Sequence, residues 1–174
     1  IQENLKHKKW EHLLFSYHGI PERHIRKSDI TKSHCKIDKN CCQTTSKAHR
    51  YCYRHQCYET TRQVAEYLEL KEGTYSTSFQ SRLGVDPWLQ PYTDQTIARF
   101  AKKGVKNMAI VTPAFVSDCL ETLEEIGMEA AEDFEEKGGE ELHVIPCINT
   151  RADWVNVMSR WIDQWAKAEN VTSA

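Results

Sequence analysis

Glycine, proline and long apolar runs are scarce in this sequence, whose 174 residues include seven glycines and five prolines. No apolar stretch approaches the roughly 18 residues that a membrane-spanning helix needs, and no signal-peptide pattern is present, so we expect neither a membrane span nor export. Charge of one sign is not in excess either: the formal net charge is −2, which gives no electrostatic argument for a nucleic-acid partner. The remaining composition, 40% hydrophobic and 28% charged, is that of one globular domain with a real core.

Cysteine, by contrast, is abundant, with seven residues in the chain and five of them between residues 35 and 57. An odd, crowded set in a chain without a secretory signal argues against a disulfide framework and for metal ligation. The five are Cys35, Cys41, Cys42, Cys52 and Cys57. The chain also opens on Ile1 rather than methionine, and we expect it to be a piece of a longer protein.

Short apolar runs alternate with stretches of helical periodicity along the chain. They predict strands at about 12–17, 75–79, 107–112 and 142–146, and helices at about 50–70, 93–103, 119–137 and 151–168. Residues 28–48 are polar, cysteine-rich and without periodicity, which indicates a loop or an insertion. The alternation predicts an α/β fold of three layers, with a four-stranded parallel sheet, helices on both faces and function at the carboxyl ends of the strands.

The predicted helix after residue 119 carries Glu121, Glu125 and Glu129 at i, i+4 and i+8, so their carboxylates share one face. Like charges at this spacing cost a helix a few tenths of a kcal/mol per pair, unless the face is solvated or meets a cation. Spacing alone favours a solvated acidic face. The other interpretation is a row of oxygen ligands along which a hard divalent cation could pass.

Two strand-ending loops carry further candidates. His18 directly follows the first strand and precedes Gly19, where an imidazole can act near neutral pH, although a lone histidine is more often structural. Phe79, Gln80 and Arg82, together with Trp88, offer an aromatic floor, an amide and a guanidinium that suit a flat apolar ligand with acidic edges. The two aromatic side chains could equally be core.

Four blocks of the sequence together resemble the ferrochelatase family. They are FSYHGIPER at 15–23, SFQSRLG at 78–84, PWLQPYTD at 87–94 and FVSDCLETLEEI at 115–126, in the family's order. The resemblance implies a Rossmann-like, chelatase-like domain that inserts Fe²⁺ into a porphyrin to make haem. It covers only the carboxy-terminal half of a ferrochelatase, so residues 1–174 are expected to be that half, with a cysteine-rich insertion at about 28–57 and without the amino-terminal domain.

The resemblance also implies a role for each candidate. His18 and Glu121 match the family's catalytic pair on opposite sides of the macrocycle, and His18, Glu121, Glu125 and Glu129 match the proposed path of iron or protons. The porphyrin would contact Tyr17, Phe79, Gln80, Arg82 and Trp88. The helix around Glu121 is expected to widen to π geometry. Cys119 stands where animal members carry histidine; a thiolate there could bind soft metals, but we expect an inert, small apolar residue.

Some members of the family hold a [2Fe–2S] cluster, and certain bacterial ones do so through an insertion after the His-Gly-Ile-Pro loop. This sequence resembles those members, which implies four thiolate ligands. The set we expect is Cys35, Cys42, Cys52 and Cys57, with Cys41 able to replace Cys42. Structural Zn²⁺ in the same ligands is the alternative, and without the resemblance it would be preferred.

The resemblance implies porphyrin, Fe²⁺ and the amino-terminal domain as partners, with protoporphyrin IX preferred over coproporphyrin as the substrate. It places the protein in the cytoplasm, leaves peripheral contact with the inner face of the cytoplasmic membrane open because porphyrin is greasy, and leaves a homodimer open. A second class of function also stays open at this point, namely a non-catalytic α/β module that carries an iron–sulfur or zinc site.

Overall fold

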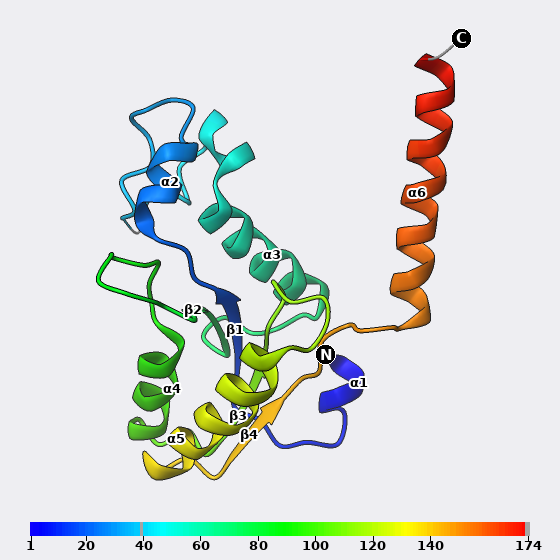
Figure 1. The fold of residues 1–174 in the computed structure, drawn as a ribbon. Helices are drawn as coiled ribbons and strands as arrows, with labels where there is room; N and C mark the ends of the chain where they lie inside the picture. Colours follow the sequence, from blue (N-terminus) through cyan, green and yellow to red (C-terminus); the bar gives the residue numbers. More distant parts are fainter. Residues whose placement is uncertain (39, 173–174) are drawn as a thin grey trace.

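A parallel sheet of four strands lies at the centre of the computed structural model, which describes residues 1–38 and 40–172 (Figure 1). The strands are β1 (His12–His18), β2 (Tyr75–Gln80), β3 (Asn107–Val111) and β4 (Glu141–Val144). Their order is β2-β1-β3-β4, and every neighbouring pair is parallel. All four predicted strands are therefore confirmed, with bounds that differ by one or two residues.

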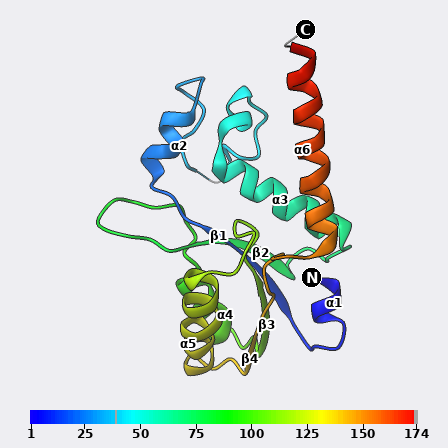
Figure 2. The same ribbon diagram turned by 45° about the vertical axis from the view of Figure 1, so that its right-hand side comes forward.

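The helices lie around this sheet (Figures 1 and 2). They are α1 (Gln2–Leu5), α2 (Glu22–Ser28), the 3₁₀ helix η1 (Lys47–Tyr51), α3 (Tyr53–Tyr67), α4 (Thr93–Lys102), the π-helix η2 (Glu121–Glu129), α5 (Ala130–Glu136) and α6 (Ala152–Thr172). The short helices α1 and α2 were not predicted, because neither is long enough to show helical periodicity. The π geometry expected around Glu121 is confirmed.

Strand β1 lies in the middle of the sheet, and its first six residues are all buried, because helices cover both faces. Successive side chains of a strand point to opposite faces. Leu13 and Phe15 accordingly pack in the core on the side of α3, whereas Leu14 packs with Ile97 of α4 and Phe134 of α5. These two cores confirm the three-layer α/β architecture.

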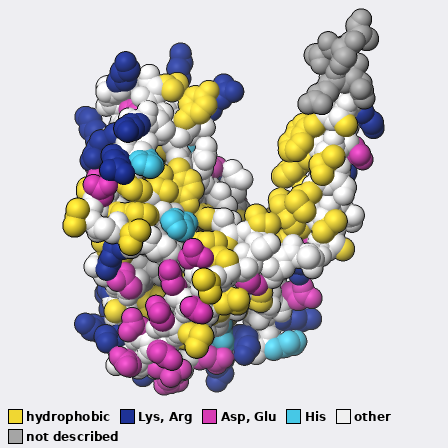
Figure 3. Space-filling model, viewed as in Figure 1, with side chains coloured by type: hydrophobic (Ala, Val, Ile, Leu, Met, Phe, Trp, Pro, Cys, Tyr) yellow, Lys and Arg dark blue, Asp and Glu magenta, His cyan; other side chains and the backbone are white. Residues whose placement is uncertain are grey.

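Helix α6 is the exception to this packing. It extends away from the rest of the chain in both ribbon views, although a helix there was predicted as part of an ordinary α/β alternation (Figures 1 and 2). Its apolar side chains are left exposed: Trp161 is 45% and Trp165 64% exposed. Figure 3 shows these side chains gathered along the face of the helix that is turned toward the body, across open space. Among the described residues, no helix is both long enough and apolar enough to cross a membrane.

His12 makes the stability of this core depend on pH. Its ring lies 4.0 Å from that of Phe100, its Nε2 lies 2.8 Å from Ser76 Oγ, and burial lowers its pKa to about 4. An unfolded chain takes up the proton at its ordinary pKa near 6.5, so stability is lost as pH falls from about 6.5 to about 4. We expect His12 to lower the free energy of unfolding by about 2 kcal/mol between pH 7 and pH 5.

Urea unfolding of the wild-type chain and of His12→Gln at both pH values measures this effect. Glutamine keeps a polar group near Ser76 but does not titrate, so the variant should lose much less stability than the wild type over the same interval. The exposed His7, substituted in the same way, is the control and should leave the pH dependence unchanged. Equal losses in the wild type and His12→Gln would contradict the prediction.

Candidate active site

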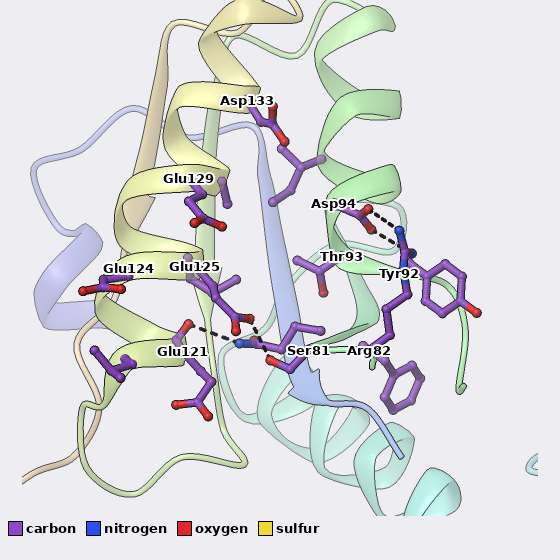
Figure 4. A pocket seen from close by; sticks show the side chains of 16 residues that line it. Ser81, Arg82, Tyr92, Thr93, Asp94, Glu121, Glu124, Glu125, Glu129 and Asp133 are labelled. Carbon is purple, nitrogen blue, oxygen red and sulfur yellow. Dashed lines mark hydrogen bonds and ion pairs between the residues drawn. The ribbon is translucent and has the colours of Figure 1, made fainter. Parts of the chain in front are cut away.

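The candidate site lies at the carboxyl ends of β1 and β2, where an open α/β sheet ordinarily binds its ligand. A cavity of about 590 Å³ opens there between the end of β2, the start of α4 and the π-helix η2 (Figure 4). Its polar lining consists of Gln80, Ser81, Arg82, Tyr92, Thr93, Asp94, Glu121, Glu124, Glu125, Glu129 and Asp133. The cavity is therefore strongly acidic along the helical side.

His18 is the last residue of β1 and is half-buried. Its Nδ1 lies 2.6 Å from the carbonyl oxygen of Gly19. Because a carbonyl only accepts, Nδ1 carries the proton, and in the neutral ring this leaves the lone pair of Nε2 free. The rings of Phe115 and Trp88 lie 5.9 and 6.3 Å from the imidazole, centroid to centroid. They form apolar walls beside a nitrogen that can accept a proton.

The main chain on either side of His18 is tightly held. Gly19 donates its N–H to the carbonyl of Gln80 over 2.8 Å, and a Cβ at position 19 would stand 2.9 Å from that oxygen. Only glycine allows this approach. The hydroxyl of Tyr53, at the start of α3, donates to the carbonyl oxygen of His18 over 2.8 Å. Bonds from β2 and from α3 thus fix the position of the imidazole.

Glu121 begins the π-helix, whose hydrogen bonds run from residue i+5 to residue i, as from Ala130 N–H to Glu125 C=O. The pKa of Glu121 is lowered, first by a hydrogen bond from the thiol of Cys119, then by its own backbone N–H and by the charge of His18. Cys119 thus lies near enough to Glu121 to lower the pKa of that carboxylate, and its chemical inertness stays a prediction. His18 is the smallest of these influences; it lies at the same edge of the sheet but is not among the residues that line the cavity.

The next residues of the acidic row follow Glu121 along the helical side of the cavity (Figure 4). The Glu125 carboxylate accepts from Ser81 Oγ over 2.8 Å, and the amide of Gln80 donates to the carbonyl of Glu121 over 3.3 Å. Ser81 has a φ of 63°, in the left-handed region, so the end of β2 turns sharply toward the π-helix. Asp133, which the sequence analysis did not select, continues the row one turn beyond Glu129.

The five residues expected to contact a porphyrin are not all exposed to one opening. Phe79 and Gln80 line the cavity, and Arg82 reaches it while pairing with Asp94 over 2.9 Å. Trp88 lies outside that lining, packed against Gly19 and donating its indole N–H to the carbonyl of Leu83. Tyr17 is buried under α3.

The Tyr17 hydroxyl lies 3.0 Å from Thr61 Oγ1, and burial raises the pKa of the phenol. In this structure the side chain therefore packs in the core and is not exposed to the cavity.

A carboxylate that the sequence analysis did not select holds the loop before the π-helix. Asp118 accepts from the side-chain amide of Asn149 over 2.6 Å and from the backbone N–H of Cys147 over 3.2 Å. These bonds lower its pKa. The loop that carries Cys119 is thereby tied to the segment after β4, which positions the start of the π-helix.

The cysteine-rich insertion brings several thiols into contact. Cys52 stands at the N-cap position of α3. The neighbouring thiols of Cys42 and Cys35 and the backbone N–H groups of His55 and Arg54 lower its pKa to about 5. Burial and the neighbouring Cys52 raise the pKa of Cys35 to about 12. A thiolate at a helix N-terminus is a ready metal ligand.

Cys57 stands apart from these thiols. Burial raises its pKa to about 12, its hydrogen-bond partner is the Tyr53 hydroxyl, and Cys52 acts on it only through its charge. Two aspartates shape the loop: Asp29 accepts from the N–H of Cys35, and Asp38 from that of Cys41. Within residues 1–38 and 40–172, no three side chains of His, Cys, Asp or Glu already have the arrangement of a bound metal ion. Any metal would have to draw the thiols closer together.

A three-layer parallel α/β domain, with a histidine and a π-helical row of carboxylates at the carboxyl edge of its sheet, defines the chelatase-like class of folds. A family model described as Ferrochelatase matches residues 1–166. The chain belongs to the ferrochelatase family.

The curated relatives described next are also named ferrochelatase, and they are longer than the chain. Over 160 residues the chain is 45% identical to a ferrochelatase of Opitutus terrae, a match that covers 92% of the chain and 46% of the relative. Over 150 residues it is 48% identical to a ferrochelatase of Stutzerimonas stutzeri, covering 86% of the chain and 44% of the relative. A ferrochelatase of Coxiella burnetii is 45% identical over 160 residues. The chain thus spans a little less than half the length of these relatives.

Proposed function

We propose that this chain is the carboxy-terminal half of an enzyme that inserts Fe²⁺ into a porphyrin, most favourably protoporphyrin IX, to make haem. The observation that carries the proposal is the position of His18 beside Gln80 at the carboxyl edge of the sheet, where the Gln80 amide reaches the start of the π-helix at Glu121. Metallation requires two pyrrole N–H protons to leave while the metal sheds water and enters the ring. A basic nitrogen and a carboxylate on facing elements suit the two parts of that reaction.

His18 is proposed to accept a pyrrole proton at Nε2. The Gly19 carbonyl keeps its hydrogen bond with Nδ1–H when the ring becomes positively charged, and so stabilises the imidazolium. Phe115 and Trp88 limit the access of water to the nitrogen. A positioned base of this kind typically contributes about 10²–10⁴-fold to a rate.

Glu121, Glu125 and Glu129 are proposed to pass the metal or protons to and from the macrocycle. Glu121 and Glu125 are half-buried and Glu129 is exposed, so the row leads from solvent toward the ring. Hard divalent cations prefer such oxygen ligands, and hydrated Fe²⁺ can exchange water for carboxylate stepwise along the row. Phe79, Gln80, Arg82 and Trp88, with Tyr17 behind them, would form the wall on this side of the porphyrin.

An amino-terminal domain is proposed to form the other wall around the porphyrin and to cover the apolar face of α6. The exposed apolar face of α6 needs a partner, because large apolar side chains such as Trp161 and Trp165 gain roughly 2 kcal/mol or more each on full burial. The relatives are about twice as long as the chain, so such a partner lies within the same enzyme.

A metallation assay on the complete enzyme and on the 174-residue chain tests this proposal. We expect the complete enzyme to insert Fe²⁺ or Zn²⁺ into a dicarboxylate porphyrin, and the chain alone to be more than about 100-fold slower, because half of the cleft that orients the ring is missing. Folding of the chain is checked by circular dichroism. A complete enzyme without activity would refute the function, and a fully active chain would refute the division into halves.

The insertion is proposed to carry a metal–sulfur centre, a [2Fe–2S] cluster with Zn²⁺ as the alternative. The thiols of Cys35 and Cys42 both act on the pKa of Cys52, which supports a common centre for those three. Four thiolates would hold the cluster. It would stiffen the segment between Ser28 and Lys47, in which the described residues form no strand or helix. Metal and acid-labile sulfide analysis of anaerobically prepared protein distinguishes the [2Fe–2S] cluster from Zn²⁺.

The enzyme is further proposed to act in the cytoplasm and to touch the inner face of the cytoplasmic membrane. Leu83 and Val85, in the loop next to the cavity, are almost fully exposed and lie beside Arg82, an arrangement suited to lipid tails and headgroups. Co-sedimentation with anionic vesicles, in the wild type and in Leu83→Ser/Val85→Ser, measures this contact.

A further inference from the structure

Three buried hydroxyl groups lie beneath the candidate site, on the face of the sheet that α4 covers. Ser16 of β1 pairs in register with Ser78 of β2, and their hydroxyls lie 2.8 and 2.9 Å from that of Thr93, the first residue of α4. The two serines are fully buried and Thr93 is nearly so. Burying a hydroxyl is unfavourable unless it is hydrogen-bonded, so apolar residues would stand at these positions if the face served packing alone.

The single proton of each hydroxyl fixes the direction of these hydrogen bonds. Ser16 Oγ lies 2.7 Å from Gln80 Oε1, and an amide oxygen only accepts, so Ser16 donates its proton to Gln80. Thr93 must then donate to Ser16, whose proton is already used, and Ser78 must donate to Thr93 for the same reason. The bonds therefore run one way, from Ser78 through Thr93 and Ser16 to the oxygen of Gln80. We call these three residues the hydroxyl relay.

The hydroxyl relay determines which way the Gln80 amide points. With its oxygen bound to Ser16, Gln80 directs Nε2 at the carbonyl oxygen of Glu121, 3.3 Å away (Figure 4). The opposite orientation would place the amide oxygen against that carbonyl, and both of these groups only accept. Gln80 also pairs in register with His18. One oriented amide thus joins the strand end that carries the imidazole side of the site to the first residue of the π-helix.

The π-helix is an element for which an outside contact matters. π geometry is rare and appears mostly as single-turn bulges, whereas η2 continues for nine residues. The end of β2 contacts it twice, since Ser81 donates to the carboxylate of Glu125 and Gln80 donates to the main chain at Glu121. Of these two bonds, the one from Gln80 reaches the backbone, so it bears directly on where the helix begins and where the Glu121 carboxylate lies.

Building on the proposed metallation function, we propose that Ser16 is a positioning residue, which acts through the Gln80 amide to hold the start of the π-helix and with it the Glu121 carboxylate. Ser16 itself is fully buried and does not line the cavity. Its bonds lie away from water, where hydrogen bonds are stronger and an unsatisfied partner is more costly. Without the Ser16 hydroxyl, Gln80 Oε1 loses this donor and the amide can rotate away from Glu121.

Hydrogen exchange of the complete enzyme, measured by mass spectrometry over the segment 119–130, tests the effect on the π-helix. Ser16→Ala removes the donor to Gln80. Ser78→Ala is the matched control, because Ser78 is equally buried and bonds to the same Thr93, but its hydrogen bond does not reach Gln80. We expect the segment to exchange about tenfold faster in Ser16→Ala than in the wild type, as the loss of one buried hydrogen bond would produce, and Ser78→Ala to match the wild type.

Two further variants test the direction of the bonds. Ser16→Cys keeps a weak donor of similar size, so its exchange should be intermediate between Ser16→Ala and the wild type. Gln80→Glu still accepts from Ser16, but it presents a second oxygen to the Glu121 carbonyl, where a donor is needed. Its exchange should therefore be at least as fast as that of Ser16→Ala. Circular dichroism checks that each variant is folded, and Ser16→Cys carries the comparison if Ser16→Ala does not fold.

Steady-state kinetics of Zn²⁺ insertion into a dicarboxylate porphyrin test the effect on the reaction. We expect Ser16→Ala to lower kcat about tenfold and to leave KM for the porphyrin within about twofold, because a displaced Glu121 affects the chemical step while the binding wall stays intact. Ser78→Ala should leave both values within about twofold of the wild type. General loosening of the site would instead raise KM, so the division between kcat and KM separates positioning from a merely structural role.

Equal exchange over residues 119–130 in Ser16→Ala and Ser78→Ala would overturn the link from Ser16 to the π-helix. Faster exchange in Ser16→Ala with an unchanged kcat would overturn the positioning role, and so would a loss of kcat without faster exchange. A wild-type enzyme that does not metallate porphyrin would refute the proposed function, and the exchange comparison would then decide the link from Ser16 to the π-helix by itself. The two failures are therefore distinguishable.

Discussion

Replacing His18 by alanine is expected to slow porphyrin metallation by the complete enzyme by about 10²–10⁴-fold. The reason lies in the tautomer that the main chain imposes. The Gly19 carbonyl binds Nδ1–H, so the basic nitrogen of the His18 ring is Nε2, and alanine removes it. The loss should fall on kcat more than on KM, because the ring takes part in proton transfer and contributes little to the area of the binding wall.

Glu121→Gln, which keeps the shape of the side chain and removes its charge, should give a loss of similar size if the carboxylate acts across the macrocycle from His18. His24→Ala is the control, since His24 is exposed on α2 and away from the cavity. Initial rates with Zn²⁺ and a dicarboxylate porphyrin measure all three variants. Normal turnover in both His18→Ala and Glu121→Gln would refute the catalytic pair.

Replacing Cys52 by serine is expected to abolish metal binding by the insertion and to unfold it locally. Two neighbouring thiols and the backbone N–H groups at the start of α3 lower the pKa of Cys52 to about 5, so it is the thiol best prepared to be a thiolate. It is also shared by both ligand sets considered for the centre. In zinc-finger peptides, a structural metal contributes on the order of 10 kcal/mol to folding, far more than the insertion can gain from its few buried apolar groups.

Iron, sulfide and zinc analysis measures the loss of metal. Limited proteolysis between residues 28 and 52 measures the local unfolding of the insertion. Cys147→Ser, outside the insertion, should retain both metal and protease resistance. A Cys52→Ser variant with full metal content would exclude Cys52 as a ligand. Cleavage of the wild type after chelation, at the same positions as in Cys52→Ser, would attribute the protection to the metal.

The sequence was sufficient to predict the sheet, because its strands are short apolar runs whose burial pattern is local. It also predicted the acidic row and the position of His18, since each follows a strand end. Asp118 contacts Asn149, 31 positions further along the chain, and Arg54 contacts two cysteines 12 and 13 positions before it, and no periodic pattern links either set of residues. The sequence analysis therefore selected neither of them.

Helix α6 shows a second limit of prediction from sequence. Its periodicity correctly predicts an amphipathic helix, but periodicity states only that one face will be buried and not what buries it. Tyr17 gives a third case: it lies between two residues of a motif at a strand end, yet alternation along β1 turns its ring into the core.

The hydroxyl bond from Tyr53 to the main chain of His18 has a consequence for regulation. Tyr53 follows Cys52 directly, so the residue that holds the imidazole in place is covalently joined to a proposed ligand of the metal–sulfur centre. Oxidative damage or nitrosylation that displaces the start of α3 would move that hydroxyl, and the imidazole would lose one of its anchors.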